Sequence, residues 1–175
     1  MTTYTLPERN DTYEDWAGCQ ARGYVPTERQ RPIVDAVAAA LAAGLYYSRD
    51  VLADVIRRMG IPPEVAEVQQ SQTCRNEGGV VGMDAYYARR YLEARAAHRA
   101  EDEARAILAP EPGKALGTLI FSDCKQTRAC TIIAAPPGDD IRVQGTRGRY
   151  SVLVTCTARQ IVAAQERARE RAGSR

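Results

Sequence analysis

The sequence predicts an α+β protein in which a helical N-terminal part of about four helices precedes a four-stranded antiparallel β-meander and a C-terminal helix. In the N-terminal part apolar residues recur at helical spacing, whereas after Gly113 their period changes to two. Pro110 and Pro112 separate the two patterns and mark a linker. We therefore expect three regions: an irregular arm over residues 1–26, a helical region over residues 27–109, and a β-meander with a closing helix over residues 113–175.

Four segments of the N-terminal part carry the signals of helices. The first, from about Pro32 to Ala43, has proline at its first position and Gly44 directly after its last. The second begins at Ser48, a good N-cap, and its apolar residues share one face until Gly60. A third helix is predicted over residues 63–73. The fourth, residues 83–108, is rich in Ala, Glu and Arg, and its heptad seam is too polar for a coiled coil, so we expect a projecting, partly solvated helix.

Four short strands are predicted after the linker. They cover residues 116–122, 131–135, 141–144 and 149–157, and turn sequences rich in Pro, Gly and Asp separate the later ones. Because the connections are short, the strands should follow one another in meander order. Thr157 and Gln160 then form a capping box, so the last helix should begin there and run to about Arg171.

Charge is distributed unevenly along a chain that is nearly neutral as a whole. Lys and Arg number 24 against 22 Asp and Glu, yet residues 113–175 carry 11 basic and 5 acidic residues. This asymmetry can mark a surface for nucleic acid or another acidic partner, and an uneven solvated surface is an equal alternative. The 22 Arg against 2 Lys are typical of a GC-rich genome, and a bacterial or phage origin fits this composition. The Arg excess therefore carries no argument about phosphate contacts by itself.

The basic residues of the C-terminal part are the candidate nucleic-acid-binding residues. Lys125 and Arg128 are expected at one hairpin tip, Arg147 and Arg149 at another, and Arg159 on the last helix. Guanidinium and ammonium groups in such places can bind phosphates without reading bases. The sequence thus favours a small, non-enzymatic accessory or regulatory protein that contacts the phosphate backbone of DNA or RNA.

Two other classes of function stay open at this stage. A protein–protein or assembly module would use helix 83–108, for example in a homodimer, without any nucleic acid. An enzyme with an unrecognised site is the third class. A helix-turn-helix over residues 48–72 fits poorly, since its second helix would present acidic residues to phosphates and no basic residue before Arg75.

The residues that usually carry catalysis or bind metals are scarce. His98 is the only histidine, which excludes sites that need two or more. Neither a Cys-x-x-Cys pair nor a phosphate-binding glycine loop is present. Cys124 and Cys130 flank the first hairpin tip, where two small semi-buried residues are favoured over a disulfide or half a metal site. We therefore expect no catalytic residue, no metal and no cofactor.

The cysteines and the N-terminal residues indicate in which cellular compartment the protein is expected. Five cysteines, an odd number, favour reduced thiols, and the first ten residues lack a cationic segment followed by an apolar one. The longest apolar run, residues 36–47, is shorter than the roughly 20 residues needed to span a bilayer. We expect a cytoplasmic protein that makes no contact with a membrane.

Overall fold

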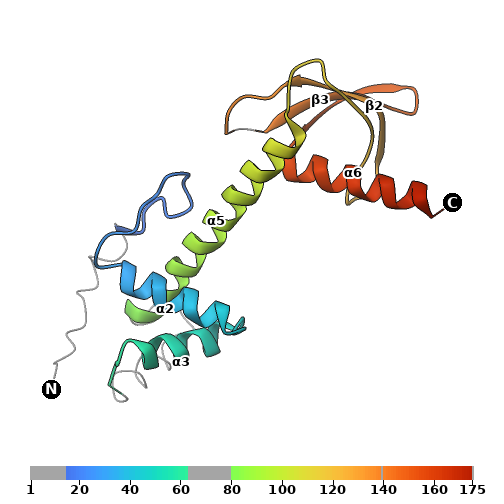
Figure 1. Cartoon of the computed structure of the whole chain (residues 1–175). Helices are drawn as coiled ribbons and strands as arrows, with labels where there is room; N and C mark the ends of the chain where they lie inside the picture. Colours follow the sequence, from blue (N-terminus) through green and yellow to red (C-terminus); the bar gives the residue numbers. More distant parts are fainter. Residues whose placement is uncertain (1–14, 63–79, 139, 175) are drawn as a thin grey trace. The chain divides into compact units, whose positions relative to one another are not determined.

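The computed structural model describes residues 15–62, 80–138 and 140–174, and it has the predicted α+β fold (Figure 1). The predicted helix over residues 63–73 lies outside the described residues. The chain divides into two compact units, Met1–Ala96 and Ala97–Arg175. The elements, in chain order, are α2 (Arg31–Ala42), α3 (Ser48–Arg58), α5 (Val80–Leu108), β1 (Ala115–Ile120), β2 (Gln126–Ala134), β3 (Ile141–Arg147), β4 (Tyr150–Cys156) and α6 (Ala158–Gly173).

The first unit is built around a buried aromatic residue. Trp16, the only tryptophan of the chain, is 3% exposed and stacks near Tyr24 and Tyr87, with ring centroids 6.4 and 6.2 Å away. Apolar faces of α2 and α3 and the first part of α5 complete this core. Trp16 and Tyr24, which belong to the predicted N-terminal arm, thus pack into this core, and Tyr13 of the same arm lies outside the described residues.

A buried carboxyl group lies beside Trp16 in the first unit. The indole Nε1–H of Trp16 donates a hydrogen bond to Oδ1 of Asp84, 3.2 Å away, and the Asp84 side chain is shielded from water. Burial is the largest influence on this group and raises the pKa of Asp84 from its ordinary 3.8 to about 6, against the opposing effects of the Trp16 hydrogen bond and the charge of Arg29.

Helix α5 contributes to the cores of both units. Ala85, Ala88 and Tyr91 are buried in the first unit, and Ala104 and Leu108 are buried in the second. Between Tyr91 and Ala104 no side chain is buried, which agrees with the predicted partly solvated helix. None of the described helices is long and apolar enough to cross a membrane.

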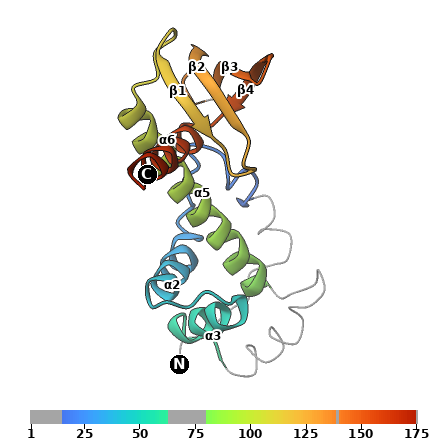
Figure 2. The same ribbon diagram turned by 90° about the vertical axis from the view of Figure 1, so that its right-hand side faces the viewer.

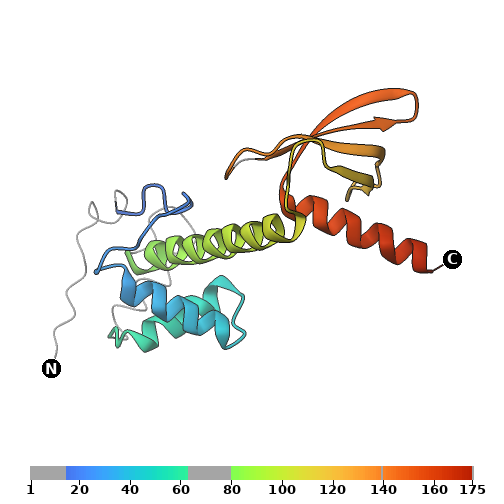
Figure 3. The same ribbon diagram turned by 45° about the horizontal axis from the view of Figure 1, so that its top comes forward.

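The second unit is a four-stranded antiparallel sheet with α6 packed against one face (Figures 2 and 3). The strands lie side by side in the order β1-β2-β3-β4, as the short connections predicted. The capping box at the start of α6 is confirmed, because Thr157 and Gln160 exchange side-chain and backbone hydrogen bonds. The buried residues of this core are Ala104, Leu108, Leu116, Leu119, Cys130, Ile132, Ile141, Val143, Cys156, Ala158, Ile161 and Ala164.

A glycine permits the close approach of β2 and β3. The register between these strands shifts between Arg128 and Thr131, where β2 is irregular. Gly145 of β3 faces this irregularity, and a Cβ atom there would lie 2.6 Å from Cγ2 of Thr127 and 3.0 Å from Sγ of Cys130. Only a residue without a side chain fits this position. Gly145 therefore allows the irregular part of β2 to lie close to β3.

Replacement of Asp84 by Asn should change how the stability of the first unit depends on pH. The folded chain holds the Asp84 proton more tightly than the unfolded chain does. The free energy of unfolding of the native protein, relative to that of the variant, therefore falls as pH rises from about 4 to about 6. Above about pH 6 the difference is constant. We expect a fall of about 3 kcal/mol, since the pKa rises by about two units and each unit corresponds to about 1.4 kcal/mol. Urea unfolding followed by Trp16 fluorescence measures it, and a pH-independent difference would contradict the assignment.

Replacement of Gly145 by Ala should destabilise the second unit. Because the added Cβ meets both a side chain and a sulfur atom of β2, we expect a cost of about 1 to 3 kcal/mol in the free energy of unfolding. Gly173→Ala is the matched control, since nothing lies within 4 Å of its added Cβ. Equal melting temperatures for the two variants would show that β2 can move away from the added Cβ without loss of stability, and would contradict the prediction.

Candidate nucleic-acid interface

Two hairpin turns meet at one end of the sheet. In an antiparallel meander successive turns alternate between the ends, so the β1–β2 turn, residues 121–125, and the β3–β4 turn, residues 148–149, lie at the same end. The C-terminal end of α6 points the same way (Figure 3), and Arg167 of α6 donates from Nη2 to the carbonyl of Ile120, 3.0 Å away. We call this the basic end.

Electrostatic interactions link the two turns of the basic end. Lys125 Nζ lies 3.0 Å from a carboxylate oxygen of Asp123, and hydrogen bonds from the side chain and backbone of Lys125 are the main reason that the pKa of Asp123 is lowered. The charge of Arg147, on the other hairpin, also lowers it. Since the Lys125–Asp123 pair is exposed, it contributes little to stability and leaves the ammonium group accessible.

The Arg147 side chain makes few hydrogen bonds to the residues that the structure describes. Its Nη2 donates to Oγ1 of Thr127 at 3.4 Å, a long hydrogen bond, and its Nε is buried without a partner in the described ranges. A guanidinium has five N–H donors. Among the described residues, Arg147 therefore has one hydrogen-bond partner, and the exposed Arg149 follows it in the adjoining turn.

Arg128 lies within β2 and not in the hairpin tip where it was expected. The sequence placed the start of this strand at Thr131, but pairing with β1 extends β2 back to Gln126. The Arg128 side chain is exposed and pairs across the strands with Thr146 of β3. It therefore belongs to the face of the sheet opposite α6, which we call the open face.

The open face carries a second arginine that the sequence reasoning missed. Arg142 lies between Ile141 and Val143, whose side chains are buried under α6, so its own side chain projects from the open face and is exposed. The alternation of apolar and polar residues along β3 is the signal that predicts this orientation. Neither Arg128 nor Arg142 forms an ion pair with a residue that the structure describes.

The four strands contain no acidic residue. Their only charged residues are Arg128 and Arg142 on the open face and Arg147, which by strand alternation lies on the same face as Val143. The open face also presents uncharged polar groups, including Thr131, Gln144 and Ser151. Tyr150, 76% exposed, follows Arg149 directly and is the one aromatic residue of the strands. The surface therefore offers positive charge and hydrogen-bonding groups without repulsion of an anion by the strands themselves.

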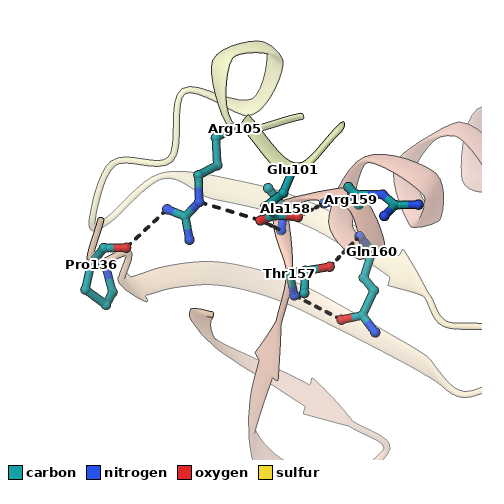
Figure 4. Close-up of polar contacts among 7 residues, drawn as sticks. All are labelled: Glu101, Arg105, Pro136, Thr157, Ala158, Arg159 and Gln160. Atoms are coloured by element: carbon teal, nitrogen blue, oxygen red, sulfur yellow. Dashed lines mark hydrogen bonds and ion pairs between the residues drawn. The ribbon is translucent and has the colours of Figure 1, made fainter. Parts of the chain in front are cut away.

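Arg159 is not part of this surface. It lies in the first turn of α6, which begins at the end of the sheet opposite the basic end. Its backbone N–H and that of Ala158 donate to the two carboxylate oxygens of Glu101, at 3.1 and 2.6 Å (Figure 4). Glu101 thus binds the positive end of the α6 dipole and joins this helix to α5.

The cysteines do not form the pair that the sequence left open. Cys124 is exposed in the β1–β2 turn, Cys130 is buried, and both are free thiols. Burial raises the pKa of Cys130, and it raises the pKa of Cys156 to about 11, so these two thiols stay protonated at neutral pH. Within the described part of the chain, no group of three or more His, Cys, Asp or Glu residues could hold a metal ion.

Replacement of Glu101 by Ala should loosen the start of α6. Two backbone N–H groups lose their acceptor and the helix dipole loses a carboxylate, so we expect the free energy of unfolding of the second unit to fall by about 1 to 3 kcal/mol. Glu103→Ala, an exposed glutamate two residues away, should change it little. Thermal unfolding followed by circular dichroism compares the two variants, and equal losses would contradict the capping role.

Comparison of the chain with protein-family models, with curated proteins and with solved structures finds no match.

Proposed function

We propose that the protein is a small, non-enzymatic accessory or regulatory protein that contacts the phosphate backbone of nucleic acid. The contact surface consists of the basic end and the open face of the sheet. The observation that carries this proposal is that the four strands have three arginines and no acidic residue, while Lys125 and Arg149 extend the same charge into the two turns.

The arrangement suits a phosphate chain that runs from the basic end across the open face. Arg128 is opposite Thr146, and Arg142 lies four residues before Thr146 on the neighbouring strand, which is about 14 Å along the sheet. Gln144 lies between their levels on β3, and its side-chain amide is 3.4 Å from the hydroxyl of Ser151 on β4. Such groups and guanidiniums are the usual partners of phosphate oxygens. Base recognition has no comparable support, so we expect binding with little sequence preference.

The alternative of an assembly module that uses helix 83–108 has weaker support. Among the α5 side chains that the structure describes, the large exposed apolar ones are Tyr86 and Ile107, at 53% and 75% exposure. They are 21 residues apart, which is about 31 Å along a helix, so they do not form one patch. The residues between Tyr91 and Ala104 that are not buried are mostly polar or alanine.

Binding of the full chain to fluorescent random-sequence duplex DNA, single-stranded DNA and RNA tests the proposal. Fluorescence anisotropy should show binding at low salt, with an affinity that falls steeply as salt rises. Arg128→Gln, Arg142→Gln and Arg149→Gln, which change exposed side chains, should each weaken binding and reduce the salt slope by about 1.

Arg159→Gln is the matched control, because Arg159 is an exposed arginine of the same unit at the opposite end. It should bind like the unmodified chain. The proposal fails if none of the three nucleic acids binds at low salt, or if Arg159→Gln weakens binding as much as the open-face variants do.

A further inference from the structure

The last strand of the sheet has one side without a partner. β4 pairs with β3 residue for residue from Tyr150 to Cys156, without a bulge, and forms one edge of the sheet. In the ranges that the structure describes, no backbone hydrogen bond joins the outer side of β4 to another segment. The N–H and C=O groups on that side are therefore available to a further strand.

β4 lacks the features by which edge strands usually avoid such pairing. Its sequence, Tyr-Ser-Val-Leu-Val-Thr-Cys, contains no charged residue, no proline and no glycine, and four of its seven residues are β-branched or aromatic. The central residue, Leu153, is 57% exposed on the open face. The strand is thus regular and uncharged over its whole length, and its outer side lacks the usual features that block pairing.

We propose that β4 pairs in antiparallel fashion with β4 of a second copy of this chain, about a two-fold axis at Leu153. The strand is self-complementary in this register. Leu153 meets Leu153 of the second copy, Val152 meets Val154, and Ser151 meets Thr155, so apolar side chains face apolar ones and hydroxyls face hydroxyls. Two-fold symmetry repeats every contact and closes the assembly at two copies.

The charges at the two ends of β4 are complementary in this arrangement. Arg149 precedes β4 at the basic end. At the other end is the exposed Asp140, close enough for its charge to raise the pKa of Cys156. Because the paired strands run in opposite directions, Arg149 of each copy lies beside the end that carries Asp140 of the other. The two residues are about two strand spacings apart, near 10 Å between backbones, within reach of an arginine side chain.

This pairing would join the two sheets into one of eight strands. The open faces would become continuous, and Arg128 and Arg142 would be present twice. The pairing does not depend on the proposed contact with nucleic acid, because its evidence is the edge of β4 and not the basic end.

Disulfide cross-linking tests the register directly. In a chain with Cys74 and Cys124 replaced by serine, Leu153→Cys should form a disulfide with its own copy under mild oxidation, because directly opposed residues have Cβ atoms about 5 Å apart. Ser151→Cys should not cross-link to itself, since the two copies of residue 151 would be about 14 Å apart. When it is mixed with a Thr155→Cys chain, a disulfide between the two chains should form.

Light scattering on the chain without added cysteines tests the dimer itself. The unmodified chain should have the mass of two copies, and Leu153→Lys should be monomeric, because it places two ammonium groups side by side on the axis. Ile107→Lys changes another exposed apolar residue and should remain dimeric. A monomeric unmodified chain, a dimeric Leu153→Lys chain, or cross-linking of Ser151→Cys to itself in place of Leu153→Cys would overturn the proposal.

Discussion

Burial of only one face of the sheet is the constraint on which the rest of the second unit depends. Side chains of a strand alternate between the two faces, so once α6 covers Ile141 and Val143, Arg142 must project from the opposite face. The same alternation places Arg128 and Leu153 on the open face. Gly145 supports the arrangement, because it lets β2 approach β3 at the point where the register of β2 shifts.

The position of α6 depends in turn on directional contacts at both of its ends. Glu101 of α5 accepts hydrogen bonds from the first two backbone N–H groups of α6, while Thr157 and Gln160 complete the cap. At the other end of the helix, Arg167 binds the carbonyl of Ile120. Apolar packing covers the sheet, and these directional contacts determine where along it the helix lies.

Two surfaces follow from this one-sided burial, and they differ in chemistry. The open face and the basic end present arginines without acidic neighbours on the strands, which suits an anionic polymer. The outer edge of β4 presents uncharged backbone and apolar side chains, which suit a second strand. The two surfaces meet at the open face, where Leu153 lies at the edge and Arg128 and Arg142 lie on the two inner strands.

The sequence alone determined the α+β class, the meander order, the capping box and the surplus of positive charge after Gly113, because periodicity, turn residues and caps act over a few neighbouring residues. It did not place Arg128 correctly, since the start of β2 depends on pairing with β1, nor did it separate Arg159 from the other basic residues. Tertiary structure alone decided that Glu101 caps α6 and that Asp84 is buried against Trp16. Each of these contacts joins residues distant in the sequence, and its energy comes from burial and pairing that no local pattern encodes.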